Sequence, residues 1–525
     1  MRSRRRRPEN SGQKIARRAR SVTAAVILSR LLGLVREQVL AAFLGAGREM
    51  DAFVVGYRIP NLLRDLFAEG ALGMAFTRVF SATREREGED AAFEAAREAL
   101  TVFGILVLMV VLLGEILAPH LVGLIAPDFK NLPEKFSLSV LLTRIMWPFL
   151  FFISLSAILA GMLNTFGVFF WPAASSALFN LSAIVGGLVL YFFFPSLGLP
   201  PVAGFATGVL LGGALQMGFN GFFLARKGFS FRLRPAFSSP AVKETLRLVG
   251  PSVLGLSAVQ INVFLNTYFA TSCGEGAVSW LAYAFRLMYV PLGLFGVGLS
   301  LALLPTASRE VARGDQRALR ESFSSSLLVG LSLSLPSAAG LVILSEPIVR
   351  LIFEHGRFLP SDTLHTAQAL SFFALGLPFY GATKVMVPVY YALGNTLIPA
   401  LSSVLAVGVN LLVILLTLPL LNFKAIALGT AVSLAAQSIF LLIFLRAQIP
   451  GLIPRKFLLG LFKILTKTLL MGGLAFILRE RWPIWILIPL CGAFFLLLAR
   501  LMGPEEALYF WRLGMRSRES SQRSS

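Results

Sequence analysis

Long apolar stretches separated by short polar or basic segments recur along the 525-residue chain. A membrane-spanning helix needs about 20 predominantly apolar residues, and most of these stretches reach that length. The pattern predicts an all-α polytopic membrane protein with fourteen transmembrane helices. The expected segments are 22–44, 52–77, 99–118, 137–163, 172–194, 201–225, 246–272, 277–306, 323–345, 364–393, 397–421, 423–446, 457–478 and 482–502.

The composition agrees with this pattern, because 56% of the residues are hydrophobic and only 14% are charged. Soluble domains carry about 25% charged residues, so a water-soluble globular protein is excluded. The net charge of +21 would suit a nucleic-acid surface, but long apolar runs separate the basic clusters. If the N-terminus is inside, 30 Lys and Arg residues lie on the cytoplasmic side and 8 on the opposite side. This asymmetry predicts cytoplasmic termini and no nucleic-acid partner.

An internal repeat divides the chain into two parallel halves. A shift of about 228 residues aligns the segment around Arg58 with that around Arg286, Pro172 with Pro399, and Pro148 with Pro378. Six spans in each half give both halves the same orientation, an arrangement typical of transporters with a central substrate path. The expected parts are a basic cytoplasmic arm (1–21), an N-terminal lobe (22–225), a basic linker (226–245), a C-terminal lobe (246–446), two last helices (447–502) and a cytoplasmic tail (503–525).

Several arginines fall inside predicted spans, where each costs roughly 2.5 to 3.5 kcal/mol. They are Arg30, Arg36, Arg58, Arg64, Arg144 and Arg286. Such residues must face a protein interior or a water-filled cavity. The nearby acids Glu37, Asp65 and Glu69 are too few to balance them, and pairing within one helix is expected to be poor, because Arg30 and Glu37 lie seven residues apart. Guanidinium groups bind phosphate bidentately, so the excess charge predicts a diphosphate ligand.

Signatures of other chemistry are not recognisable in the sequence. Two cysteines and three histidines are too scattered for a metal site, and no Walker loop is present. We therefore expect a transporter, not an enzyme, without a cofactor or metal. The acids of segment 78–98 alternate with arginines and indicate a solvated connector. Lys384, Lys463 and Lys467 are expected to snorkel towards headgroups.

Specific stretches resemble the MurJ (MviN) lipid II flippase family of the MOP exporter superfamily. They are SRLLGLVRE at 29–37, the segment beginning at Asp51, RIPNLLR at 58–64 with FAEGA at 67–71, YAFRL at 283–287 and FEHGRF at 353–358. The resemblance covers essentially the whole chain, including the last pair of helices. The N-terminal stretch is the most specific part.

This resemblance implies two six-helix lobes around a V-shaped cavity, and a lipid-tail groove formed by the last two helices. It implies transport of undecaprenyl-diphosphate-linked disaccharide peptide from the inner to the outer leaflet of the bacterial cytoplasmic (inner) membrane, in peptidoglycan and cell wall biogenesis. The implied substrate-binding residues are Arg30, Arg36, Arg64, Arg286 and Asp51. Arg58, Asn61 and Glu69 are expected as further cavity residues. The implied partners are lipid II and membrane lipids, with a monomer that serves the cell-wall synthesis machinery.

The chain also departs from the family pattern. Phe285 and Tyr289 stand where many members have acidic or amide residues, and the expected seventh and eleventh spans carry no carboxylate for a sodium site. Two alternatives stay open at this point: an exporter of another polyprenyl-diphosphate-linked oligosaccharide, and a membrane-embedded glycosyl- or phosphotransferase.

Overall fold

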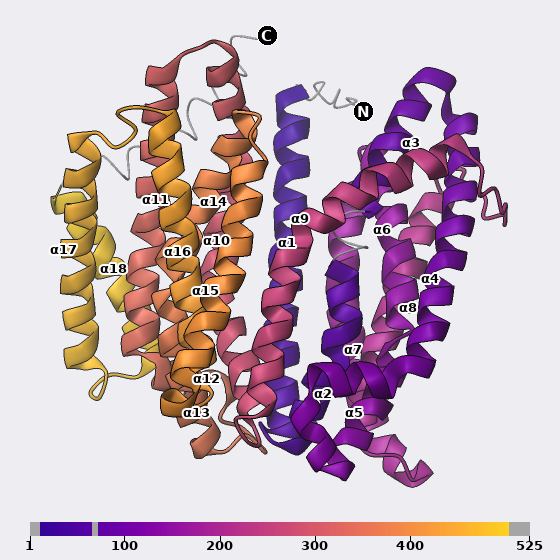
Figure 1. The fold of residues 1–525 in the computed structure, drawn as a ribbon, viewed down its shortest axis with the longest axis horizontal. Helices are drawn as coiled ribbons and strands as arrows, with labels where there is room; N and C mark the ends of the chain where they lie inside the picture. The colour runs from indigo at the N-terminus through magenta and orange to yellow at the C-terminus, as the bar shows by residue number, and fades with distance from the viewer. Residues whose placement is uncertain (1–10, 66–71, 503–525) are drawn as a thin grey trace, which may run out of the picture. The chain divides into compact units, whose positions relative to one another are not determined.

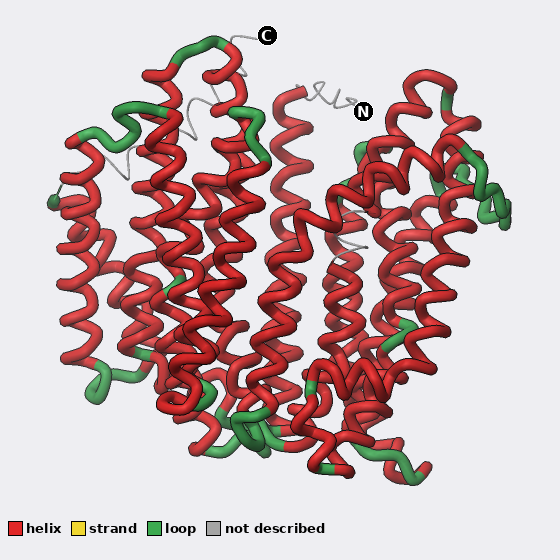
Figure 2. Tube along the Cα trace, viewed as in Figure 1, coloured by secondary structure: helices red, strands yellow, loops and turns green. Residues whose placement is uncertain are grey.

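The computed structural model describes residues 11–65 and 72–502, and these residues form helices and loops without β-strands (Figures 1 and 2). The chain divides into two compact units, Met1–Gln260 and Ile261–Ser525. The prediction of an all-α polytopic fold is confirmed. The residue limits given above for the arm, the lobes, the linker, the last two helices and the tail remain a prediction.

The first unit contains eight helices and part of a ninth among the described residues. Their bounds are α1 Ser11–Leu44, α2 Arg48–Leu63, α3 Gly73–Glu87, α4 Glu89–Ile125, α5 Pro133–Met146, α6 Phe149–Thr165, α7 Phe170–Phe193 and α8 Val202–Ala225. Short 3-10 turns, η2 Pro127–Asn131 and η3 Phe194–Leu197, follow α4 and α7.

The helix α9 (Pro240–Thr271) crosses the boundary between the units. Ala241, near its start, packs with Val79 of α3 and Ala95 of α4. Its later residues Asn262 and Asn266 hydrogen-bond to helices of the second unit. The two ends of one long helix therefore belong to different cores.

The second unit continues with nine further helices in the described part of the chain. They are α10 Ala277–Ala312, α11 Gln316–Ile343, α12 Ser345–Phe353, α13 Pro360–Leu375, α14 Leu377–Ala392, α15 Leu397–Leu421, α16 Lys424–Gln448, α17 Arg455–Leu478 and α18 Ile484–Leu501. The helix α17 packs on α11 and α18 packs on α17, so this last pair lies at the edge of the unit (Figure 1).

Within the described ranges, eleven helical segments are long and apolar enough to cross a membrane. Each overlaps one of the fourteen expected spans. The described residues of the other three expected segments lie mainly in α1, in α2 and α3, and in α9. The first two of these carry the arginines and acids that lower their hydropathy. The chain is an integral membrane protein, and the count of fourteen spans remains a prediction.

Some predicted loops are wrong. The expected connector 78–98 is helical except at Gly88, where φ is +96° and glycine is favoured. Its charged residues form ion pairs, such as Arg84 with Glu89 and Arg97 with Glu94. The helix α12 was not expected at all. Conversely, the predicted spans around Pro148 and Pro378 are each broken into two helices, at residues 147–148 and at Gly376.

Close helix packing in the first unit depends on small residues. A Cβ atom on Gly204 of α8 would lie 2.3 Å from the backbone nitrogen of Tyr191, and one on Gly208 would lie 2.7 Å from that of Gly187. Glycines at four-residue spacing allow helix backbones to approach closely in membranes. The helices α7 and α8 are therefore closely packed in the first unit.

Candidate functional site

The guanidinium group of Arg36 belongs to a charged cluster in the first unit. Arg36 is on α1, and its Nη2 donates to Glu37 Oε1 at 2.7 Å. The side chain of Arg36 is only 11% exposed and lies 5.8 Å from the ring centre of Phe179 on α7. A guanidinium carries five N–H groups, so one bond to Glu37 does not saturate it.

Arg64, which directly follows α2, forms a similar pair with its neighbour. Its Nε and Nη2 donate to Asp65 Oδ1 at 3.1 and 2.8 Å, and its Nη1 donates to the Tyr57 hydroxyl at 3.3 Å. The charge of Arg36 interacts electrostatically with Tyr57 and is repelled by Arg64. The structure therefore brings Arg36 and Arg64 into one cluster with two acids.

This cluster corrects the charge argument drawn from the sequence. Pairing between residues seven apart was expected to be poor, but Glu37 and Asp65 instead pair with the arginine adjacent to each of them. The acids therefore neutralise two arginines in this unit. Any diphosphate that binds here must compete with the protein's own carboxylates.

Asp51 lies at the start of α2 and is completely buried. Its Oδ2 accepts a hydrogen bond from Lys135 Nζ of α5 at 2.7 Å. Lys135 also lies 4.3 Å from the ring centre of Phe129. Gly56 lets α2 approach α5 this closely, because a Cβ atom there would lie 3.1 Å from the backbone nitrogen of Thr143. The sequence did not indicate Lys135 as a partner, since 84 residues separate it from Asp51.

The other candidate residues of the first unit have different surroundings. Arg30 is exposed on α1 and has neither a hydrogen bond nor an ion pair with any residue of the described ranges. Arg58 is half-buried, and Asn61 Nδ2 donates to Asp65 Oδ2 at 3.4 Å. Arg144 Nε donates to the main-chain oxygen of Glu115. Glu69 lies outside the described residues.

Arg286 is exposed on α10 of the second unit. One turn further along, the hydroxyls of Tyr289 and Tyr380 lie 2.9 Å apart. Lys384 Nζ lies 5.0 Å from the ring centre of Tyr380, and the rings of Phe285 and Tyr289 are 4.9 Å apart. Phe285 and Tyr289 thus place aromatic rings on either side of Arg286 along α10.

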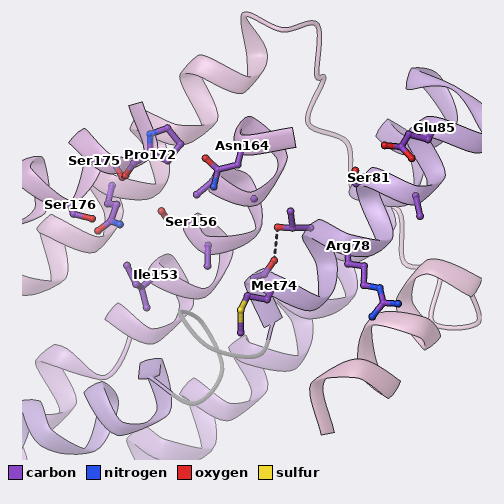
Figure 3. A pocket seen from close by; sticks show the side chains of 17 residues that line it. Met74, Arg78, Ser81, Glu85, Ile153, Ser156, Asn164, Pro172, Ser175 and Ser176 are labelled. Carbon is purple, nitrogen blue, oxygen red and sulfur yellow. Dashed lines mark hydrogen bonds between the residues drawn. The ribbon is translucent and has the colours of Figure 1, made fainter. Parts of the chain in front are cut away.

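A cavity of about 800 Å³ opens between α3, α6, α7 and α8 of the first unit (Figure 3). Serine, asparagine and glutamine side chains line it, and none of them was selected from the sequence. Their only signal is helical spacing: Ile153, Ser156, Ala160 and Asn164 share one face of α6. Among the described residues, no group of three His, Cys, Asp or Glu side chains could hold a metal ion.

Comparison with known proteins assigns the family. A sequence model described as lipid II flippase MurJ matches residues 40–495. A probable lipid II flippase MurJ from Rhizobium meliloti is 35% identical over 79% of this chain and 77% of its own length. One from Buchnera aphidicola subsp. Schizaphis graminum is 31% identical and covers 92% of both chains.

Solved structures support the same fold. A lipid II flippase MurJ in an inward closed conformation matches with a TM-score of 0.76 and 24% identity, covering 92% of this chain and 98% of that one. An inward-facing multidrug resistance MATE family transporter of the MOP superfamily gives a TM-score of 0.64, with 17% identity over 83% of this chain and 98% of that one. From the family match over residues 40–495, this chain belongs to the MurJ family of lipid II flippases.

Proposed function

We propose that this chain is a lipid II flippase of the bacterial cytoplasmic (inner) membrane. The observation that carries the proposal is the family match over residues 40–495, together with relatives named probable lipid II flippase. The cargo would be undecaprenyl-diphosphate-linked disaccharide peptide, moved from the inner to the outer leaflet for peptidoglycan synthesis. The chain is a transporter.

Within this function, Arg30, Arg36, Arg64 and Arg286 clamp the diphosphate. Arg36 and Arg64 already share a cluster in the first unit, and Arg286 lies in the second. An anion shared by the two units would favour one conformation of the transporter over the other, as alternating access requires. Arg58, Asn61 and Asp51 support the first-unit side of the clamp.

The charge of the clamp also suggests what the cargo displaces. In the structure, Glu37 and Asp65 occupy N–H groups of Arg36 and Arg64. Phosphate oxygens bind the same donors with bidentate geometry. We infer that the diphosphate takes over these donors and releases the two carboxylates.

The proposed topology has both termini in the cytoplasm, because the basic residues concentrate there under the positive-inside rule. The first lobe (22–225) and the second (246–446) would move against each other, and the helices of 447–502 would hold the lipid tail. The protein would act as a monomer beside the cell-wall synthesis machinery.

A depletion experiment tests this function. Cells whose only lipid II flippase has been depleted should regain growth when this chain is expressed, and lipid II should again become accessible at the outer leaflet. Replacing Arg64 or Arg286 by alanine should abolish the rescue while the protein remains in the membrane. Persistent outer-leaflet lipid II without any flippase would reject the function, and full rescue by a variant without both arginines would reject the clamp.

A further inference from the structure

Arg144 of α5 is one of six arginines named in the predicted spans, and the proposed clamp with its supporting residues uses the other five. The residue is exposed, and its Nε donates to the main-chain oxygen of Glu115 on α4 at 3.2 Å. The polar cavity is lined from α3, α6, α7 and α8, whereas α4 runs along the edge of the first unit (Figure 1). Arg144 therefore lies at the periphery of this unit, away from the cavity.

The surface of α4 around this contact is apolar and open. Leu112, Leu113 and Ile116 are 58, 56 and 72% exposed, respectively. In an integral membrane protein, such an exposed apolar helix surface faces the acyl chains of lipids. A charged side chain at this surface is costly unless it reaches the headgroup layer or pairs with an opposite charge. The guanidinium group of Arg144 therefore needs polar partners at the lipid boundary.

The hydrogen bond to α4 also indicates the depth of the guanidinium group. Arg144 lies seven residues, or about 10 Å, inside the expected span 137–163. Glu115, which its side chain reaches, lies three residues, or about 4.5 Å, from the end of the expected span 99–118. The side chain thus extends towards the membrane surface, as snorkelling arginines do. Its charged end lies near the level at which acyl chains meet headgroups.

Tight packing one turn along α5 holds the arginine in this place. A Cβ atom on Gly114 of α4 would lie 1.8 Å from the ring of Trp147, so the indole fits only against a glycine. Trp147 is buried, and its Nε1 donates to the main-chain oxygen of Val110 at 3.2 Å. The helices α4 and α5 are therefore fixed against each other beside Arg144, and the site is formed before a ligand binds.

The two side chains offer complementary charges to a ligand. The Nη1 and Nη2 groups of Arg144 make no hydrogen bond within the described ranges, which leaves four N–H donors for the oxygens of a phosphate. The carboxylate of Glu115 accepts no hydrogen bond from a described residue and interacts electrostatically with Arg144. A carboxylate in this position repels further negative charge and attracts an ammonium group. The matching ligand therefore carries a phosphate and an ammonium group close together.

We propose that Arg144 and Glu115 bind the headgroup of an outer-leaflet aminophospholipid, such as phosphatidylethanolamine, with its phosphate on the guanidinium and its ammonium on the carboxylate. A diphosphate fits this pair poorly, because it adds negative charge beside Glu115 and has no adjacent ammonium. The inference goes beyond the proposed function and uses only the proposed topology, under which this end of α4 faces the outer leaflet. The bound lipid would hold the edge of the first unit at a fixed depth.

Titration of the purified full chain in detergent with three phospholipids of identical acyl chains tests this site. Native mass spectrometry counts the lipids bound at each concentration and gives their affinities. The parent chain should bind one phosphatidylethanolamine about tenfold more tightly than either other lipid. Phosphatidylcholine has a methylated ammonium without N–H donors, and phosphatidylglycerol has no cation.

Variants separate the contributions of the two side chains. Arg144→Leu should weaken phosphatidylethanolamine binding about tenfold, and Arg144→Lys should weaken it less, because a positive charge remains. Glu115→Gln should reduce the preference over phosphatidylcholine and strengthen phosphatidylglycerol binding, because the repelling carboxylate is gone. Arg479→Leu is the matched control, since Arg479 is an exposed arginine beside Glu480 directly after α17, and phosphatidylethanolamine should bind this variant as it binds the parent.

The comparison of three phospholipids on the parent chain needs no variant, so it decides the matter even if a variant fails to fold. Equal affinity of the parent for all three lipids, or unchanged phosphatidylethanolamine affinity in Arg144→Leu, would overturn the inference. Undecaprenyl diphosphate represents the other source of a lipid phosphate and should bind Arg144→Leu as tightly as the parent. A parallel loss of this probe would assign Arg144 to the path of the cargo and would equally overturn the inference.

Discussion

The carboxylate of Asp51 and the ammonium group of Lys135 lie 2.7 Å apart in a contact between α2 and α5. Their side chains are 0% and 3% exposed, respectively. Neither charged group is accessible to water. The ion pair joins α2 and α5, and Asp51 lies near the start of α2, which ends directly before Arg64. The predicted role of Asp51 in substrate binding can therefore be separated from a role in positioning α2.

The first prediction concerns the stability of this ion pair. Asp51→Asn or Lys135→Met leaves one buried charge without its partner, which typically costs about 3 to 5 kcal/mol. Each single variant should lower the melting temperature of the purified protein in detergent. The double variant should be more stable than either single variant, because no charge remains unpaired. Equal losses that simply add in the double variant would contradict the pair.

Growth rescue by the same double variant distinguishes the two roles of Asp51. If Asp51 only positions α2, the double variant should restore rescue together with stability. If it also contacts the cargo, stability should return without rescue. Growth rescue should be normalised to the amount of each variant that is inserted in the membrane.

The second prediction concerns competition between acids and cargo. Glu37→Gln removes the charge that faces Arg36, whose side chain is only 11% exposed. The substrate-free protein should become less stable, and the melting temperature should rise more on adding lipid II than it does for the parent, because ligand stabilisation increases with affinity. Glu346→Gln is the matched control, since its partner Arg350 is 57% exposed and such surface pairs contribute little. A smaller lipid II shift than in the parent would exclude competition.

The sequence singled out the arginines inside predicted spans, but it did not predict their partners. Hydropathy and insertion cost selected Arg36 and Arg64 because a charge inside an apolar run is conspicuous. Consecutive residues on a helix diverge by about 100°, so Arg36 and Glu37 did not look like a pair. Their long side chains nevertheless meet. The Asp51 and Lys135 pair depends on tertiary packing, which a single sequence does not reveal.

The prediction for Lys467 is wrong, because its surroundings also depend on tertiary packing. A lysine in a spanning helix was expected to snorkel, but Lys467 of α17 is completely buried and lies 5.9 Å from the ring centre of Phe495 on α18. Which face of α17 meets α11 and α18 depends on the whole unit. The polar cavity was not predicted for a related reason. Asn164 and Gln216 lie 52 residues apart on different helices, and neither residue stands out in the sequence by itself.

The third prediction tests the close contact between α7 and α8. Gly208→Leu would drive side-chain atoms into the backbone of Gly187, because a Cβ atom at position 208 would already lie 2.7 Å from the Gly187 nitrogen. Because the atoms in contact belong to the backbone and cannot turn aside as a flexible side chain can, the helices must separate, and the melting temperature should fall by several degrees. Gly218→Leu on the same helix meets open space and should have little effect. Equal melting temperatures for the two variants would mean that this contact does not limit stability.

The fourth prediction compares two buried asparagines on α7 and α15, two helices that correspond to each other in the internal repeat. Asn180 of α7 donates to main-chain oxygens of Ser29 at 3.1 Å and Ser176 at 3.2 Å. Asn410 of α15 instead donates to the side-chain oxygens of Asn262 at 2.6 Å and Asn266 at 2.8 Å. Helical carbonyls keep their backbone hydrogen bonds when Asn180 is lost, but the two side-chain acceptors lose a partner when Asn410 is replaced. Asn410→Leu should therefore destabilise the protein by about 2 kcal/mol, and Asn180→Leu by less than about 1 kcal/mol.

A triple variant separates the hydrogen bonds of Asn410 from its packing. Replacing a buried donor alone leaves acceptors unsatisfied, whereas replacing donor and acceptors together by apolar groups of similar shape is nearly neutral. Asn410→Leu combined with Asn262→Leu and Asn266→Leu should thus regain most of the stability that Asn410→Leu loses. Reversible unfolding in detergent measures both differences. If the triple variant is less stable than the single one, relief of the unsatisfied acceptors does not govern stability here, and the asparagines contribute through other contacts, such as the hydrogen bond from Asn266 to Thr430.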